Sequence, residues 1–482
     1  MNRIFAEFCS TTGIAYEAAA SSAQVEEDEV TLASRLAVTE LAVGAVAAAA
    51  AAAAHFARAR GASPVTTRWA VPARAVAASY RGDQLLRVDG QAFPGFAELS
   101  GFFRTRDGWV RTHANYPHHR ARLLAALDLP EDGGRDALVT RLAECDALDV
   151  EDRVRAHQGI AVAVRTPQEW AAHPQCAAVA GLPLVGIEVV GDAGDAPVRA
   201  YPGKLRDPNR PAAGVRVLDL TRVIAGPVAT RTLALLGADV LRVDDPNMPE
   251  IVAQHLDNGM GKRSALLDLR DDADREIFDG LLETADVVVT AYRPHALDGY
   301  GLAPGELARR RPGIVIATLD AWGNAGPWQD RRGFDSIVQA ATGISMLTSR
   351  DGDNAGDRDG DAGAKRPGAL PAQALDHASG YLLAAGVLVA LSRQTTEAAS
   401  LHVHTHLART AHALLGLGDG PSEPPFEPLA LDDCMSEQDT PSGRLRYPRP
   451  AFLPTVPMAQ PYDYPSVGGT WGTDAPEWSP GR

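Results

Sequence analysis

The chain has 482 residues, 45% hydrophobic and 22% charged, which is ordinary for a soluble globular protein and long enough for two or three domains. Its formal net charge of −15 argues against a general nucleic-acid binder or a protein that binds anionic membranes. The four cysteines are scattered and include no CxxC pair, which argues against a disulfide framework or a zinc knuckle and predicts a reducing, cytoplasmic compartment.

The N-terminal region is predicted to contain a flexible lead-in over residues 1–30, polar and acidic in "SSAQVEEDEV", and then a long helix over about 31–60. The N-terminal region has no basic stretch followed by a leucine-rich core, so a signal peptide is not indicated. The uninterrupted apolar run from Leu41 to Ala54 is too short and too rich in alanine to span a bilayer. It predicts a packed helix, so no membrane partner is expected.

Composition divides the remaining chain into four parts. Residues 31–200 are predicted to hold the long helix and a small mixed α/β domain. A linker rich in proline, glycine and charge covers residues 201–214 ("YPGKLRDPNRPAAG"). A Rossmann-like catalytic domain is expected over 215–416, and a C-terminal return segment over 417–482.

Strands and helices alternate regularly after the linker. The strands are predicted in "VRVLDL" (215–220), "ADVLRVD" (238–244), "DVVVTA" (286–291) and "GIVIATLDAWG" (313–323). This spacing predicts βαβ units, hence an α/β fold with a buried, Rossmann-like parallel sheet. Ligands of such sheets bind at the carboxyl ends of the strands, here beyond Leu220, Val243 and Ala291.

Common nucleotide and calcium motifs do not fit. The turn after the first strand carries one glycine, Gly226, where a dinucleotide fingerprint needs three, although Asp244 would suit a ribose hydroxyl. The turn still offers a helix N-terminus with free amides near Val223, Ile224 and Ala225, suited to an anion or a polar ligand. In the aspartate-rich segment 351–363, alanines stand where an EF-hand needs two of its ligands. No GxSxG elbow or Walker loop is present.

Histidines alternate in "LHVHTHL", so His402, His404 and His406 would share one face of a strand. The outer two would lie about 13 Å apart at about 3.3 Å rise per residue, so one metal ion could not take all three. An i, i+2 pair could bind zinc with a distant third ligand, but no partner pattern supports it, and no metal site is assigned.

Two apolar stretches resemble each other. "LAVTELAVGAVAAAAAA" near 36–52 resembles "HASGYLLAAGVLVALSR" near 377–393 in the register that pairs Leu41 with Leu383 and Gly44 with Gly386. In that register Ser34 stands opposite Asp376. If the halves are duplicated, the first lacks the carboxylate.

Asp376 opens the predicted helix in "PAQALDHASGYLLAAG", and Asp at this position commonly serves as an N-cap. The sequence blocks around Asp376 suggest a further role. "VRVLDLTRVIAGPVATRTLALLGADVLRVD", "GKRSALLDLR", "ADVVVTAYRPHALDGYGL", "GFDSIVQAATG" and "ALDHASGYLLAAGVLVAL" resemble, in order, the class III CoA-transferases (the formyl-CoA and carnitine, CaiB/BaiF, CoA-transferase family). In that family the aspartate that opens the last helix is the covalent nucleophile, and it falls on Asp376.

Two further blocks match out of the usual order. "DGWVRTHANYPHHRARLLAAL" and "RTPQEWAAHPQ" resemble the family's small domain, which normally follows the nucleophile. The chain therefore resembles two trimmed and fused copies. The resemblance implies a homodimer, or an intrachain pseudo-dimer that closes the site within one chain.

The resemblance implies a CoA-transferase that moves CoA from an acyl-CoA thioester to a carboxylic acid through an aspartyl intermediate. CoA is then a substrate, and no permanently bound cofactor is expected. Asp376 would be the catalytic residue, its charge favoured by the helix N-terminus. The residues that the resemblance assigns to CoA are Val223, Ile224, Ala225, Lys262, Arg263, Tyr292, Arg293 and Arg332.

The chain departs from the family pattern at Ala291, His295 and Gly299, and it has Asp244 and Asp245 where a basic residue is common. Two alternatives stay open. An acyl-CoA racemase of the same fold needs two bases, but Phe334 occupies the place of the racemases' histidine. A pseudoenzyme would bind CoA without forming an acyl adduct.

Overall fold

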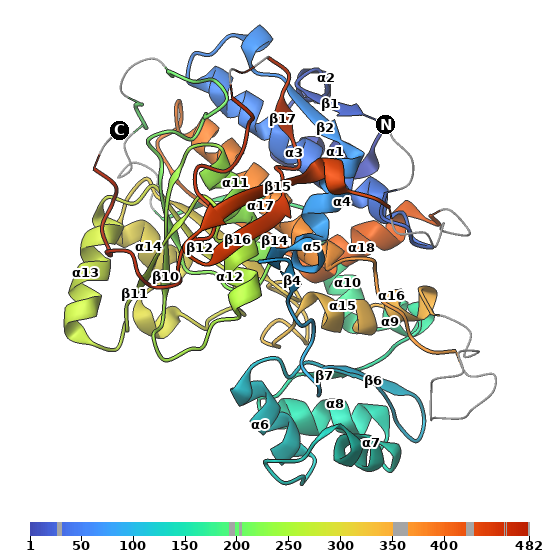
Figure 1. Ribbon diagram of the computed structural model, residues 1–482. Helices are drawn as coiled ribbons and strands as arrows, with labels where there is room; N and C mark the ends of the chain where they lie inside the picture. The colour runs from blue at the N-terminus through green and yellow to red at the C-terminus, as the bar shows by residue number, and fades with distance from the viewer. Residues whose placement is uncertain are drawn as a thin grey trace.

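A seven-stranded sheet forms the centre of the computed structural model (Figure 1). The structure describes residues 1–26, 31–191, 198–201, 205–349, 365–420, 429–456, 458 and 460–480. The aspartate-rich segment 351–363, considered above for calcium, lies outside the described residues.

The strands of this sheet follow the order β11-β10-β9-β12-β13-β14-β8. All neighbours pair in parallel except β8, which runs antiparallel to β14 at one edge. The bounds in that order are Arg263–Leu266, Asp239–Asp244, Arg216–Asp219, Val287–Thr290, Val315–Asp320, Ser400–His406 and Gly186–Val190. The predicted parallel α/β sheet is confirmed.

Helices cover both faces of the sheet, because neighbouring residues of a buried parallel strand point to opposite sides. Val217 of β9 packs in the core shared with α11 (Ala225–Leu235) and α17 (Ala374–Arg393). Leu218, the next residue, packs on the other face with α13 (Asp272–Glu283) and α14 (Pro304–Arg310). Short helices α12 (Val252–Asn258), α15 (Asp335–Ala341) and α16 (Ile344–Leu347) and the longer α18 (Leu407–Leu417) complete this part of the chain.

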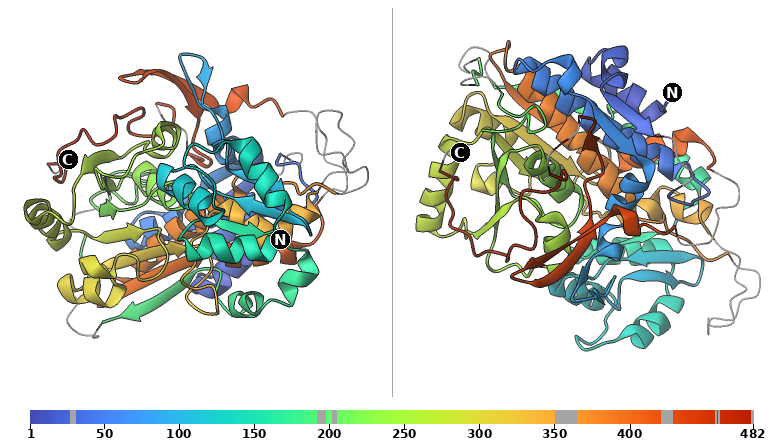
Figure 2. Two further views of the ribbon diagram at one scale, coloured as in Figure 1. Left: turned by 90° about the horizontal axis from the view of Figure 1, so that it is seen from below. Right: turned by 45° about the horizontal axis from the view of Figure 1, so that its top comes forward.

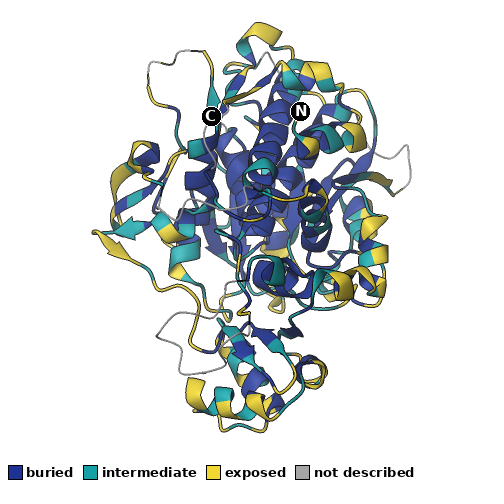
Figure 3. Cartoon of the chain, turned by 90° about the vertical axis from the view of Figure 1, so that its right-hand side faces the viewer, coloured by how far each residue is buried: buried dark blue, intermediate teal, exposed yellow. Residues whose placement is uncertain are grey.

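Two long apolar helices, α3 (Val38–Ala59) and α17, pack against each other in the core. Both are long and apolar enough to cross a membrane by length and composition. However, 89% and 100% of their most apolar windows are buried inside the protein, as the dark core in Figure 3 shows. Small alanine side chains let the helix axes approach closely. The prediction of a packed helix over Leu41–Ala54 is confirmed.

The prediction of a flexible lead-in over residues 1–30 is wrong for most of its length. Residues 3–26 form α1 (Arg3–Thr12), α2 (Tyr16–Ala20) and β1 (Ala23–Glu26), and α1 packs on α3. Ile4, Phe5 and Phe8 supply an apolar face that the acidic stretch further along obscured, and all three are buried. Residues 27–30 lie outside the described part of the chain.

A small domain projects from the rest of the molecule (Figure 1). Its sheet consists of β5 (Gly101–Arg104), β6 (Trp109–Thr112) and β7 (Ala161–Ala163), and it has a core of its own. The helices α6 (Pro117–Ala126), α7 (Arg135–Ala143) and α8 (Ala147–Ala156) cover it, and α9 (Pro167–Ala171) and α10 (Pro174–Ala180) lead back toward β8.

Strands from the N-terminal and C-terminal parts of the sequence pair with each other. The C-terminal hairpin β15 (Met435–Thr440) and β16 (Gly443–Pro448) pairs with β3 (Arg87–Val88), and β17 (Leu453–Pro454) pairs with β2 (Trp69–Pro72). Figure 2 shows the red C-terminal strands beside the blue N-terminal ones. Between β2 and β3 lie α4 (Ala73–Tyr80) and α5 (Gly82–Leu85), and β4 (Gln91–Ala92) ends this small sheet.

Candidate active site

A cavity of about 860 Å3 lies where the strands of the main sheet end. Its walls come from the segments that directly follow β9, β10, β12, β13 and β14, as expected for the carboxyl edge of a parallel sheet. The small domain closes one side through α6 and the residues around it. The small-domain residues that line the cavity are Tyr116, Pro117, His118, His119, Arg122 and Ile160.

Most of the residues expected to contact CoA line this cavity. The ones that do are Val223, Ile224, Ala225, Tyr292, Arg293 and Arg332, together with Asp376. Val223 adopts a positive φ of 75°, which is rare for a β-branched residue and turns the chain sharply from β9 into α11. The turn over Val223, Ile224 and Ala225, identified in the sequence by its free amides, therefore forms part of the cavity wall.

Lys262 and Arg263 do not line the cavity, so their expected contact with phosphate is not seen. Lys262 is buried beneath the sheet edge, where Nζ lies 2.9 Å from Asp219 Oδ2 and donates to the hydroxyl of Thr230 at 2.6 Å. Arg263 pairs with Asp239 at 2.8 Å. A buried ammonium needs a carboxylate partner, and Asp219 supplies it, which leaves Lys262 a structural role.

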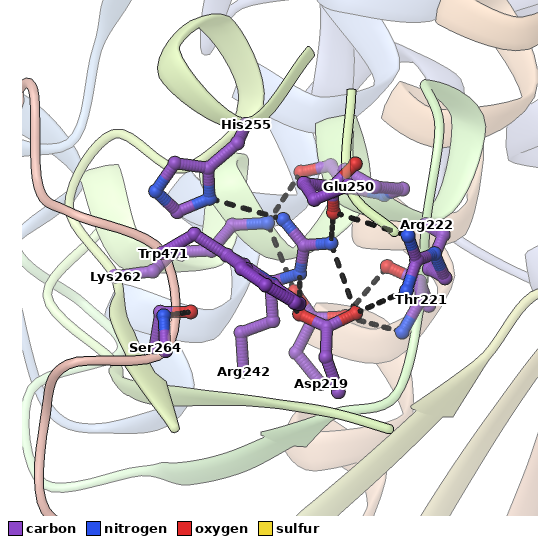
Figure 4. Close-up of polar contacts among 12 residues, drawn as sticks. Asp219, Thr221, Arg222, Arg242, Glu250, His255, Lys262, Ser264 and Trp471 are labelled. Carbon is purple, nitrogen blue, oxygen red and sulfur yellow. Dashed lines mark hydrogen bonds and ion pairs between the residues drawn. The ribbon is translucent and has the colours of Figure 1, made fainter. Parts of the chain in front are cut away.

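Figure 4 shows the polar network to which Lys262 belongs. Asp244 accepts from Arg242 at 3.0 Å and from the indole of Trp471 at 3.0 Å, and it pairs with Arg222 at 3.3 Å. Arg242 also pairs with Glu250. The acidic residue that departs from the family pattern thus neutralises two arginines inside the protein.

Asp376 lies in the first turn of α17, is 6% exposed and is one of the residues that line the cavity. It is not the N-cap: Gln373 holds that place, and no side chain caps the helix. Burial raises the pKa of Asp376 well above its usual range, and the neighbouring carboxyls of Asp335 and Asp83 raise it further. The expectation that the helix end favours its charged form is therefore wrong, since burial and like charges outweigh the helix dipole.

Asp335 is a second buried carboxyl group behind Asp376. Its Oδ2 accepts the backbone N–H of Asp376 at 2.9 Å, and Gln339 donates to its Oδ1. Burial raises the pKa of Asp335 to about 6. This residue belongs to the "GFD" block and went unassigned, because a sequence does not show that α15 abuts the start of α17.

His377 points away from Asp376 into the core. Its ring stacks on Tyr80 of α4, with centroids 4.9 Å apart, and it does not line the cavity. Burial lowers the pKa of His377 to about 3, so the ring is neutral at neutral pH. Adjacent helical residues point about 100° apart, and here that separates a cavity residue from a core residue.

Five arginines line the cavity, and they fall into two groups. Arg222 and Arg331 are paired with carboxylates: Arg222 with Asp244, and Arg331 with Glu151 at 2.7 Å. Arg122, Arg293 and Arg332 have no carboxylate partner among the described residues. Arg332 donates to Gln158 Oε1 at 2.6 Å and Arg122 to the Gln158 carbonyl at 3.3 Å. Arg122, Arg293 and Arg332 therefore supply positive charge where the small domain meets the main sheet.

The small-domain contribution was missed by sequence reasoning. His113 stacks on Phe334 with centroids 3.8 Å apart, and His119 meets the same ring edge-on. Burial lowers the pKa of His119 to about 3. The dense "HHRAR" at the start of α6 is the signal that could have suggested a ligand-facing helix.

The three histidines of β14 are engaged with neighbouring side chains. His402 Nε2 lies 2.8 Å from the hydroxyl of Thr318, and His404 and His406 are hydrogen-bonded to each other. No group of three His, Cys, Asp or Glu side chains in the part of the chain that the structure describes is arranged to hold a metal ion.

Residues 212–417 match the model of CoA-transferase family III. A probable fatty acyl-CoA transferase of Mycobacterium tuberculosis is 34% identical over 199 residues, which cover 38% of this chain and 47% of the relative. An acetyl-coenzyme A transferase of Hypoxylon pulicicidum is 32% identical over 52% of this chain and 44% of its own. A formyl-CoA:oxalate CoA-transferase of Rhodopseudomonas palustris is 31% identical over 38% and 43%.

A crystal structure of the mycobacterial protein superposes with a TM-score of 0.37 at 33% identity, over 43% of this chain and 57% of that one. The chain thus spans about half the length of the curated relatives that it matches. The matched region holds the six parallel strands of the sheet, the cavity loops that follow them and Asp376. Over residues 212–417, the chain is similar to CoA-transferase family III.

Proposed function

We propose that the protein moves CoA from an acyl-CoA thioester to a carboxylic acid through a covalent intermediate on Asp376. The observation that carries this proposal is the place of Asp376, which lines a cavity at the carboxyl edge of the sheet. A cavity of about 860 Å3 is in the range of sites for cofactor-sized ligands.

The reaction follows from the chemistry of a carboxylate against a thioester. The Asp376 carboxylate attacks the acyl carbonyl, the C–S bond breaks, and CoA leaves as a thiolate with an aspartyl anhydride left behind. The thiolate attacks the Asp376 carbonyl of the anhydride, which releases the donor acid and leaves an aspartyl thioester. The acceptor carboxylate then attacks that thioester, and a last thiolate attack forms the new acyl-CoA and restores Asp376.

The residues around the cavity suit the parts of the substrate. Arg122, Arg293 and Arg332 supply unpaired positive charge for the phosphates of CoA. The turn of Val223 and Ile224 supplies apolar surface and free backbone amides at the start of α11. The burial of Asp376 limits attack by water on the intermediates.

We also propose that the site is complete within one chain. Tyr80 and Gln84, from the N-terminal part of the chain, contact the start of α17: Tyr80 stacks on His377, and Gln84 Nε2 donates to the carbonyl of Pro371 at 3.1 Å. The small domain, also N-terminal, closes the cavity. A monomer in light scattering that keeps full specific activity on dilution supports this proposal, and activity confined to a dimer contradicts it. The cytoplasmic location stays a proposal too.

The decisive experiment traps the intermediate. The protein is incubated with a panel of acyl-CoA thioesters and quenched with hydroxylamine, and the peptide containing residues 371–386 is measured by mass spectrometry. We expect a hydroxamate on Asp376 that is absent in Asp376→Ala and unchanged in Asp132→Ala, an exposed carboxylate of the small domain.

Bound CoA without any adduct would contradict the proposal. It would favour a pseudoenzyme or a racemase, and uptake of solvent deuterium at the α-carbon of the substrate would separate these two.

A further inference from the structure

Apolar residues from both cores of the main sheet line the cavity. Leu297, which follows β12, packs with the core on the side of α13 and α14. A second set lines the cavity and packs in the core that holds α17. Ala225, Ala321, Phe334 and Leu407 belong to this second set, and we call these four residues the apolar recess.

Phe334 and Ala225 lie beside the start of α17, where Asp376 is. Phe334 directly precedes Asp335, whose Oδ2 accepts the backbone N–H of Asp376 at 2.9 Å. Ala225 begins α11, and a Cβ atom at Gly380, one turn after Asp376, would lie 2.4 Å from its carbonyl oxygen. Two walls of the recess are therefore fixed against the helix that carries Asp376.

Leu407 and Ala321 form the remaining side of the recess. Leu407 begins α18, and this helix contacts α17 where Ser379 Oγ lies 2.7 Å from Thr410 Oγ1. Both hydroxyls lie within the first two turns of their helices, so the two helix starts are neighbours. The residue after Leu407 donates its backbone N–H to the carbonyl of Ala321 at 2.8 Å, which holds Ala321 at the same place.

Neutral imidazoles of the small domain pack behind the recess. His113 stacks on Phe334 with ring centroids 3.8 Å apart, and His119 meets the same ring edge-on. Burial lowers the pKa of His113 well below its usual range and that of His119 to about 3. Neither ring carries a charge at neutral pH, so this side of Phe334 receives no positive charge from the two histidines.

The charged groups nearest to Asp376 are carboxyls. After burial itself, the groups that shift the pKa of Asp376 are two neighbouring carboxyls, and both raise it. Arg122 and Arg332, which line the cavity without a carboxylate partner among the described residues, both donate to Gln158 of the small domain. Their charge is therefore gathered where the small domain meets the sheet and is not paired with Asp376.

Asp320 adds a further carboxyl group to the cavity wall, directly before Ala321. Its Oδ1 accepts the backbone N–H of Gly323 at 2.6 Å, and its Oδ2 lies 2.9 Å from His406 Nδ1. Both oxygens are satisfied within the protein. A second carboxylate on a substrate would lose its water here and meet carboxyl groups instead of a cation, which is costly for a buried charge.

We propose that the recess selects an uncharged, apolar acyl group, whose chain lies against Phe334 and Leu407 while its carbonyl carbon meets Asp376. This inference rests on the proposed function and deepens it, because it names the class of acid. The donor acid leaves and the acceptor acid enters at the same carboxyl group, so both belong to this class. The substrates are then monocarboxylic acids with an aliphatic or aromatic chain and their CoA thioesters, and dicarboxylic acids are rejected.

The test compares butyryl-CoA with succinyl-CoA, which share a four-carbon chain and differ at its far end, a methyl group in one and a carboxylate in the other. The second-order rate constant of adduct formation on Asp376 is measured by rapid quench in the full-length protein. We expect butyryl-CoA to react about 100-fold faster or more, because an unpaired carboxylate is strongly disfavoured in an apolar site. The rate constant should also rise about fourfold per methylene from acetyl-CoA to butyryl-CoA.

Two substitutions that add the same charge test the position of the recess. Phe334→Arg places a cation beside the acyl chain and should narrow the ratio of the butyryl to the succinyl rate constant about 10-fold or more. Leu297→Arg adds the same charge to the part of the cavity that packs on the other core. It should change both rate constants alike and leave their ratio within about twofold.

A wild-type rate constant for succinyl-CoA equal to that for butyryl-CoA, or above it, would overturn the inference. So would equal narrowing by Phe334→Arg and Leu297→Arg, since charge anywhere in the cavity would then decide the choice of acid. If Phe334→Arg does not fold, the wild-type series from acetyl-CoA to butyryl-CoA decides, and a rate constant that does not rise with chain length overturns the recess. A wild-type protein that forms no adduct with any thioester contradicts the proposed function itself, which is a separate outcome.

Discussion

Residues 3–80 and the described residues of 335–417 share an order of helices, although the first segment also contains β1 between its short and long helices. Each segment begins with a helix, α1 or α15, and continues past a left-handed glycine, Gly13 (φ 76°) or Gly343 (φ 86°). A short helix, a long buried helix and a strand that leads directly into a helix follow. The long helices, α3 and α17, pack on each other. The similarity between α3 and α17 in the sequence is therefore accompanied by a similar order of helices around them.

The two segments differ in what they bury at matching positions. Phe5 stands eight residues before Gly13, where the second segment has Asp335 eight residues before Gly343. Ser34 stands where the second segment has Asp376. The first segment shows that this arrangement of helices needs no buried carboxyl groups. Buried carboxyls reduce stability, so their presence in the second segment points to a function rather than to folding.

The largest expected difference between the segments is in activity. Asp376→Asn removes the nucleophile and should lower CoA transfer by about 10⁴-fold or more, as the loss of a covalent nucleophile does elsewhere. Ser34→Ala, at the matching position, should leave the rate within about twofold. Steady-state transfer and the adduct mass measure both. A Ser34→Ala variant as impaired as Asp376→Asn would refute the division of roles.

The first segment should instead matter for stability. Phe5 is 5% exposed and packs in the main core, so Phe5→Ala should lower the free energy of unfolding by about 3–5 kcal/mol. Urea denaturation followed by circular dichroism measures this. A loss below about 1 kcal/mol would show that α1 contributes little to the core.

The carboxyl groups of the second segment should show the opposite effect. The raised pKa of Asp376 means that the folded protein binds a proton that the unfolded chain releases above the ordinary carboxyl pKa. Stability therefore falls as pH rises from about 4 toward the raised pKa. Asp376→Asn avoids this loss and should raise the free energy of unfolding by about 1–3 kcal/mol at pH 8, and by little at pH 3. An equal gain at both pH values would show that the proton on Asp376 is not the cause.

A substitution in the small domain, which follows the first segment in the chain, tests whether this domain contributes to the cavity that contains Asp376. Arg122→Gln should raise the KM for acyl-CoA about 10-fold, because it removes a charged contact worth about 1.5 kcal/mol or more, and the effect should shrink in high salt. Arg120→Gln is the control on the same helix, since Arg120 bonds to the carbonyl of Gly133 outside the cavity. Equal KM values for the two variants would remove Arg122 from the site.

The smallest expected effect is a change in pH dependence. Adduct formation should rise with pH as Asp376 loses its proton. Asp83, on α5, is one of the two carboxyls that raise the pKa of Asp376, so Asp83→Asn should shift the rise to lower pH, by about one pH unit or less. Rapid-quench rates between pH 5 and 9 would detect the shift. A shift to higher pH would mean that Asp83 does not repel the charged form of Asp376.

The sequence alone determined the parallel sheet, the cavity edge and the residues of the turn at Val223. These features depend on local patterns: apolar strands alternating with helices, and loops that directly follow the strands. The packed role of Leu41–Ala54 followed from composition, because a run of alanines suits close helix packing and is too short for a bilayer. Asp376 was found by resemblance, and it is one of the residues that line the cavity.

Only the tertiary structure decided which charges face the cavity and which are used within the protein. Lys262 and Arg332 look alike in sequence, yet Lys262 is buried against Asp219 while Arg332 reaches the cavity. The protonation state of Asp376 is likewise decided by the tertiary structure. Asp376 sits at a helix start, which favours a charged carboxylate, but burial beside Asp335 reverses the preference. Desolvation and like-charge repulsion depend on neighbours distant in the chain, and no local pattern encodes those distances.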